Sequence, residues 1–177
     1  MTYRDLLRRI GDDTAANVTA IYDSYTEGDL DDDETASLIA GTIANANGSA
    51  VALADVSLAA TLTLQLRRAV APLGLLPAAS DTERLYKAAT TLLTSEDTTT
   101  ERVARLGRSE PLEAAATAYS EGIAKSPEVT GWTRDVSPGA CQICQDLAGT
   151  VLPDDVEMYH HTGCTCTPVP VTERNEQ

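Results

Sequence analysis

The chain has 177 residues, enough for one modest domain or for a helical body with a small appendage. Hydrophobic residues make up 42% of it but aromatic residues only 4%, so alanine and leucine must supply most of the buried surface. That composition favours an elongated helical body that is completed by a partner. The net charge is −14, whereas a nucleic-acid-binding protein needs a basic surface, so direct nucleic-acid binding is not expected.

Neither a targeting segment nor a membrane span is expected. Residues 1–20 carry charges throughout and lack the apolar stretch of a signal peptide. The longest apolar stretches are interrupted by Asp55, by Gln65 and by the Arg67-Arg68 pair. A protein that folds in a reducing cytoplasm keeps its cysteines as thiols, which favours metal binding over disulfide formation.

Two long helices are predicted in the first part of the chain. Apolar residues at helical spacing indicate an amphipathic helix from residue 3 to about residue 26, ended by Gly28. A second helix is predicted to begin at the acidic residues 31–34, which suit the positive end of a helix dipole, and to run to Ala69. Because its apolar residues fall on more than one face, this helix is expected at the centre of a bundle.

Two shorter helices are predicted after a connector at residues 71–77. The Ser-Asp-Thr-Glu pattern at 80–83 is typical of a capping box and begins a helix that extends to about Ser95. A similar pattern at 98–101 begins a short helix that ends at Gly107.

A last helix completes the predicted fold class, which is mainly α. Pro111 falls in its first turn, and the helix reaches about Lys125 before Pro127 stops it. The predicted architecture is an elongated helical body over residues 1–127, followed by a small C-terminal metal-binding module with short strands over residues 128–177.

The composition of the sequence changes after the last predicted helix. Residues 130–134 indicate a short strand, and the chain from there to Pro170 is rich in turn residues. Trp132, the only tryptophan, lies beside the predicted domain boundary near 127–130. We expect its ring to pack the C-terminal module against the helices.

All four cysteines lie between positions 141 and 166, in a pattern typical of a metal site. Two short ligand pairs separated by a loop, Cys-x-x-Cys and His-x-x-Cys, let four side chains reach one ion. Thiolate and imidazole are soft donors that favour zinc over magnesium or calcium. The predicted cofactor is a structural zinc ion, and its candidate ligands are Cys141, Cys144, His161, Cys164 and Cys166.

The spacing leaves open which four of these five residues bind the metal. On an extended strand Cys164 and Cys166 would point to opposite faces, unless a turn at Thr165 brings them together. One of them would then pair with His161 while the other packs inside. His160 is expected in solvent or outside the ligand set. Two disulfides, or reduced cysteines in a small core, are the alternatives to a metal site.

The same segment offers little sign of catalysis. Catalytic zinc sites use three protein ligands with an acid or base nearby, whereas a thiolate-rich set with ligands to spare is typical of a closed structural site. The zinc deaminase pattern needs a His-x-Glu motif before Pro-Cys-x-x-Cys, but Ala140 replaces the proline and neither histidine precedes Cys141. We therefore expect a protein that is not an enzyme.

The order of residues in this segment is distinctive. Trp132 and Asp135 precede Cys141-x-x-Cys144, a Leu-Ala-Gly turn follows at 147–149, and His161-x-x-Cys164-x-Cys166 comes before Pro168 and Pro170. This order resembles the C-terminal signature of the phage Mu F-like head morphogenesis proteins, with an Asp before Cys-x-x-Cys, a Leu-x-Gly turn and a His-Pro-Asn-Cys-Arg-Cys box. Thr162-Gly163 stand for the usual Pro-Asn, and Thr165 for the usual Arg. The acidic Gly28-Asp29-Leu30 turn before an Ala-rich helix is similar to that of members from phages of actinobacterial hosts.

The resemblance implies a structural minor capsid protein of a tailed phage that acts in head assembly or genome delivery. Its expected partners are the portal protein and the major capsid protein, with a homo-oligomeric ring as a further expectation. Its expected location is the capsid interior or the portal vertex of the virion, after assembly in the host cytoplasm. Two other classes stay open: a metal-dependent enzyme or toxin-like effector packaged in the head, and a zinc-knuckle adaptor that binds another protein.

Overall fold

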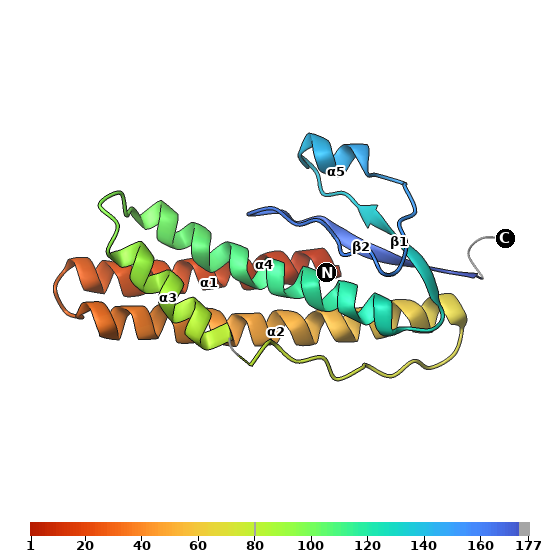
Figure 1. Ribbon diagram of the computed structural model, residues 1–177, viewed down its shortest axis with the longest axis horizontal. Helices are drawn as coiled ribbons and strands as arrows, with labels where there is room; N and C mark the ends of the chain where they lie inside the picture. The colour runs from red at the N-terminus through yellow and green to blue at the C-terminus, as the bar shows by residue number, and fades with distance from the viewer. Residues whose placement is uncertain (80, 174–177) are drawn as a thin grey trace.

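The computed structural model describes residues 1–79 and 81–173 and has an elongated helical bundle with a small strand-containing module packed beside it (Figure 1). The elements of this part are, in chain order, α1 (Tyr3–Thr26), α2 (Asp32–Leu66), α3 (Asp81–Leu93), α4 (Thr100–Lys125), β1 (Val129–Asp135), α5 (Gln142–Asp146) and β2 (Thr167–Thr172). The predicted fold class, mainly α with short strands in a C-terminal module, is confirmed.

Reciprocal side-chain caps fix the starts of the two long helices. The Thr2 hydroxyl accepts a hydrogen bond from the Asp5 amide while the Asp5 carboxylate accepts one from the Thr2 amide. Asp31 and Glu34 form the same arrangement at the start of α2. The predicted span of the first helix and the predicted start of the second are both confirmed.

The connector after α2 is anchored to the middle of that helix by one buried carboxylate. α2 ends at Leu66, before the predicted Ala69, and its C-cap Arg67 adopts a left-handed conformation with a φ of 54°. The chain then runs back along α2 (Figure 1). Asp55 is 5% exposed and accepts hydrogen bonds from the amides of residues 73, 74 and 75 at 2.8, 2.7 and 3.1 Å. These bonds hold an otherwise irregular segment in place.

α4 is one helix, so the prediction of a short helix ending at Gly107 and a new one starting at Pro111 is wrong. Packing outweighs these local helix breakers. A Cβ atom on Gly107 would lie 3.2 Å from the Ala15 Cα atom and 2.6 Å from Val18 Cγ2 of α1, so this glycine marks a close helix crossing. Pro111 is buried in the same helix, where it lacks only the hydrogen bond to the carbonyl four residues earlier.

The caps of the two later helices differ in part from the prediction. α3 lies inside the predicted span, and the start of its predicted capping box, Ser80, falls outside the described residues. The N-cap of α4 is Thr99, whose hydroxyl accepts from the Arg102 amide at 3.3 Å.

The helical body has two hydrophobic clusters along its length. One cluster joins all four long helices through Val18, Ala36, Ile39, Ala40, Ile43, Leu85, Ala89 and Val103. The other joins α1, α2 and α4 to the C-terminal module, and its largest buried members include Leu58, Leu62, Leu112, Tyr119, Ile123 and Trp132. The expected central position of α2 is confirmed, because it packs against α1, α3 and α4.

β1 and β2 form a two-stranded antiparallel sheet, so the segment that ends at Pro170, expected to be rich in turns, includes a strand with two prolines. Pro170 faces Trp132 and Pro168 faces Arg134 across the sheet. The Trp132 amide and carbonyl bond instead to Leu152 on the other side, both at 2.8 Å, so the facing proline needs no N–H group. The prolines therefore fit this strand without a lost hydrogen bond at that pair.

Trp132 joins the module to the body, as predicted. Its side chain is 1% exposed and lies in the same cluster as Leu112 and Tyr119 of α4. Its indole N–H donates to the Val156 carbonyl at 2.8 Å. Two further hydrogen bonds cross the junction, from the Gln65 amide group to the Pro170 carbonyl at 2.9 Å and from the Met158 amide to the Ser120 hydroxyl at 3.1 Å.

α2 is the one helix in the described part of the chain that has the length and apolar composition to cross a membrane. The core helix of a folded bundle meets the same criterion. The buried positions of α2 extend from Thr35 to Leu62, so packing inside the bundle accounts for much of its apolar character.

We expect Gly107→Ala to lower the free energy of unfolding by about 1–3 kcal/mol, because the added methyl group overlaps α1 at a buried crossing. Gly41→Ala is the matched control, since a Cβ atom there meets nothing within 4 Å. That change should stabilise the protein by about 0.5–1 kcal/mol through helix propensity. Urea unfolding followed by circular dichroism measures both. Equal stabilisation by the two alanines would show that the crossing is looser than described.

Candidate metal centre

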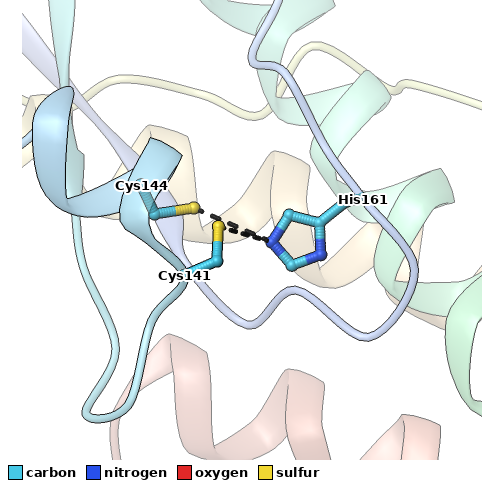
Figure 2. A group of neighbouring side chains, drawn as sticks. All are labelled: Cys141, Cys144 and His161. Atoms are coloured by element: carbon cyan, nitrogen blue, oxygen red, sulfur yellow. Dashed lines mark hydrogen bonds between the residues drawn. The ribbon is translucent and has the colours of Figure 1, made fainter.

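The first ligand pair lies at the start of α5. Cys141 is its N-cap residue, and the Cys141 carbonyl accepts from the Gln145 amide at 3.1 Å, which closes the first helical turn. Cys144 lies on that turn. Figure 2 shows that the sulfur atoms of both cysteines point toward the His161 ring. The first turn of this short helix thus places the two thiols of the Cys-x-x-Cys pair on the same side of the chain.

The second ligand pair lies on the turn that leads into β2. The Cys164 amide donates to the His161 carbonyl at 2.9 Å. Gly163 has a φ of 76°, a left-handed conformation that glycine adopts without steric cost. The Thr162-Gly163 pair therefore builds the tight turn that brings His161 and Cys164 to the same site.

Cys144 is shared by two triads of possible ligands. Its sulfur lies 3.8 Å from Cys164 Sγ and 4.0 Å from His161 Nε2, and that nitrogen is 3.1 Å from Cys141 Sγ. Within each triad the donor atoms all lie within 4.8 Å of one another, and the triads are Cys141, Cys144, His161 and Cys144, Cys164, Cys166. The fold thus brings all five predicted ligands together.

Cys164 and Cys166 do not point apart. Both precede β2 and belong to the same triad, so the alternation of side chains along a strand does not apply to them. Both are buried, as is Cys144, whereas Cys141 is partly exposed. Three of the five candidate ligands are therefore shielded from solvent, while Cys141 and His161 are partly exposed.

The donor atoms fit tetrahedral zinc. Zinc–sulfur bonds of about 2.3 Å place two sulfur ligands about 3.8 Å apart, and a sulfur and an imidazole nitrogen about 3.6 Å apart. The Cys144–Cys164 separation is 3.8 Å, and the two distances from His161 Nε2, 3.1 and 4.0 Å, lie on either side of the second value. All four cysteines are free thiols, and 3.8 Å far exceeds the about 2.05 Å of a disulfide bond.

The surroundings divide the four thiols into two kinds. Burial raises the pKa of the Cys144 thiol to about 12 and also raises the pKa of Cys164. The backbone amide of Cys144 lowers the pKa of Cys141. Burial acts against ionisation of Cys166, but hydrogen bonds from the Ser137 amide and hydroxyl leave its pKa lowered. A bound cation would offset the cost of ionising the two buried thiols.

A buried arginine faces the cluster. Arg134 on β1 is 3% exposed, its Nη2 donates to the Tyr159 carbonyl at 2.7 Å, and its Nη1 lies 3.4 Å from Cys144 Sγ. The guanidinium carbon is 5.8 Å from the centroid of the Trp132 ring. No carboxylate of the described residues forms an ion pair with it, and its Nε atom has no hydrogen-bond partner there.

This arginine explains how the site can carry negative charge. A buried guanidinium without an anionic neighbour is costly. Zinc with three thiolates and one imidazole carries one net negative charge, and zinc with four thiolates carries two. Either would place an anion beside the guanidinium, whereas neutral thiols would not. The arginine is therefore matched to a metal–thiolate centre.

Two other residues of the segment lie outside the triads. His160 Nε2 is 2.9 Å from the Cys164 carbonyl oxygen, and burial lowers the pKa of this imidazole. Its place outside the ligand set agrees with expectation. Asp135 is not a member of either triad. The Arg4 guanidinium of α1 forms an ion pair with the Asp135 carboxylate and donates a hydrogen bond to the Asp135 backbone carbonyl oxygen at 3.0 Å. Asp135 thus ties the module to the helical body.

The sequence patterns missed Arg134 and Ser137 as parts of the centre. Side chains alternate between the two faces of a strand, so Arg134 lies on the same buried face of β1 as Trp132. This alternation could have identified the arginine as buried. No pattern in the sequence marks Ser137, whose role comes from a loop conformation.

No protein-family model, curated protein or solved structure matches this chain.

In the zinc-bound protein we expect Arg134→Leu to destabilise the fold by about 2–4 kcal/mol, because it leaves the negative metal–thiolate centre without its cation and the Tyr159 carbonyl and the Cys144 sulfur without their donor. It should also weaken zinc binding about 10–100-fold, measured by competition with a chelator. Trp132 fluorescence follows unfolding of the module in urea. Arg105→Leu, at an exposed position on α4, is the control and should change stability by less than about 0.5 kcal/mol. Equal effects of the two variants would contradict the assigned role.

Proposed function

We propose that a single structural zinc ion, bound by four of the five clustered side chains, holds the C-terminal module folded. The observation that carries this proposal is the pair of triads that share Cys144. The module has little core of its own, because its buried apolar residues Val129, Trp132 and Met158 belong to the cluster of the helical body. Metal binding would supply folding free energy to such a segment.

We further propose that the whole chain is a structural, non-enzymatic minor capsid protein of a tailed phage that docks at the portal vertex. Three features support the proposal. The residue order around the centre resembles the head morphogenesis signature, a net charge of −14 disfavours direct contact with packaged DNA, and the metal-binding module is tied to the body by Trp132, Gln65 and Asp135. In this role the module would present a fixed surface to a portal or capsid ring.

The adjacent histidines offer a matched test of the zinc centre. His161→Ala should lower the zinc affinity at least tenfold, because its imidazole nitrogen lies within 4.0 Å of two thiols. His160→Ala should retain zinc, since this ring stacks beside His161 and its Nε2 lies near the Cys164 carbonyl, but it belongs to neither triad. Cys144→Ser should abolish stoichiometric zinc because it breaks both triads. Zinc content after gel filtration measures all three.

Retention of full zinc affinity by Cys144→Ser would overturn the proposed centre. Retention by His161→Ala, with loss in Cys144→Ser, would assign the site to the four cysteines instead.

Association with the portal protein tests the proposed role in the head. The chain, co-expressed with the portal protein of the same phage, should co-purify with it in a fixed ratio. Cys144→Ser should lose this association if the module forms the docking surface, while Gly41→Ala should keep it. Separate elution of chain and portal at micromolar concentration, with zinc bound, would contradict the proposed role and leave the zinc centre unaffected.

A further inference from the structure

A second candidate site lies on the helical body, in a cleft of about 390 Å³ lined by residues of α2, α3, α4 and the end of the connector. Four carboxylates line it, from Asp81, Glu110, Glu113 and Glu121, together with one cation, Arg84. The lining therefore carries an excess of three negative charges. The cleft shares no lining residue with the zinc centre.

The cation in the lining is already paired. Arg84 donates to Glu110 at 2.5 and 3.1 Å and to Asp81 at 2.6 and 3.1 Å. These contacts raise its pKa, with the hydrogen bond to Glu110 as the main cause, and keep it charged. Glu113 forms no hydrogen bond or ion pair with any described residue, although its charge acts to raise the pKa of the His160 imidazole, and Glu121 pairs only with Lys125 on the next turn. The remaining negative charge thus has no partner inside the cleft.

A buried acceptor in the lining also lacks a partner. Asn47 on α2 is 1% exposed, and its amide nitrogen donates to Asp81 at 2.8 Å. Its carbonyl oxygen forms no hydrogen bond within the described part of the chain. A buried unsatisfied acceptor is unfavourable, and a donor entering from the cleft would relieve it. Asn47 therefore indicates a ligand that carries N–H groups.

The edge of the cleft is apolar. Leu76 is 83% exposed and lies beside Pro77, and Val51 and Ala114 add apolar surface to the lining. Such surface is not needed to hold a small inorganic cation. It suits a ligand whose cationic group stands beside aliphatic groups, as in a basic segment of a polypeptide.

We propose that this cleft binds a basic segment of a partner protein, in which a lysine or arginine enters beside Glu113 and Asn47 while a neighbouring apolar side chain covers Leu76. The proposal does not rest on the zinc centre or on the proposed role in the head. A chain of net charge −14 attracts such a segment at long range, and the cleft gives it a fixed place.

The test uses the full chain and a short fluorescent peptide in which Lys-Leu pairs are separated by Gly-Ser spacers. Fluorescence anisotropy should show saturable binding. The double variant Glu113→Gln and Glu121→Gln should bind about fivefold more weakly, because two carboxylates of the cleft are lost. Leu76→Ser should also weaken binding about fivefold through loss of apolar contact.

The control is the double variant Glu83→Gln and Glu101→Gln, which makes the same change in net charge outside the cleft. Glu83 pairs with Lys87 one turn away, as Glu121 pairs with Lys125, so the two double variants are closely matched. The control should change the affinity less than about twofold. Circular dichroism confirms that each variant is folded.

Absence of peptide binding to the native chain would overturn the proposal, and so would equal losses in the two double variants, which would indicate attraction by net charge alone. Displacement of the peptide by spermidine, combined with full affinity in Leu76→Ser, would also overturn it, because a free polyamine would then account for the cleft.

Discussion

The Cys144 thiol and the Arg134 guanidinium meet in the interior of the C-terminal module, and the arrangement of the module depends on that contact. A buried positive charge needs a negative neighbour, and the described residues provide no carboxylate for it. Thiolates bound to a metal ion satisfy this need, whereas four neutral thiols do not. The same contact places β1, which carries Arg134, beside α5, which carries Cys144. The Arg134–Cys144 contact therefore links the charge of the cluster to the packing of β1 against α5.

The helical body solves a different problem, which is to build a core almost without aromatic residues. Its helices approach closely where glycine replaces a larger residue, as at Gly107 against α1. Small side chains bury little area each, so many close contacts along the elongated bundle must share the stabilisation. Tyr119 of α4 and Trp132 are the buried aromatic residues of the described part, and Trp132 lies where the module joins the body. The largest apolar side chain thus stabilises the junction between the two parts.

The helix spans at the start of the chain, the position of α2 and the clustering of the five candidate ligands could be predicted from the sequence because each leaves a local pattern. The prediction failed where tertiary packing opposes local preference. Gly107 and Pro111 indicated a break, yet packing on α1 maintains one helix. The prolines of β2 argue against a strand in the sequence, but Trp132, which faces Pro170, forms its backbone hydrogen bonds with Leu152 instead. Asp55 interrupts an apolar run in the sequence, but in the fold it anchors a connector 18 to 20 residues away.

X-ray absorption at the zinc edge of the purified, reduced protein tests the central claim most directly. A structural centre predicts one zinc per chain with four ligands, mainly sulfur at about 2.3 Å and at most one nitrogen at about 2.0–2.1 Å. A protein without bound zinc, or a zinc surrounded mainly by oxygen, would contradict the account.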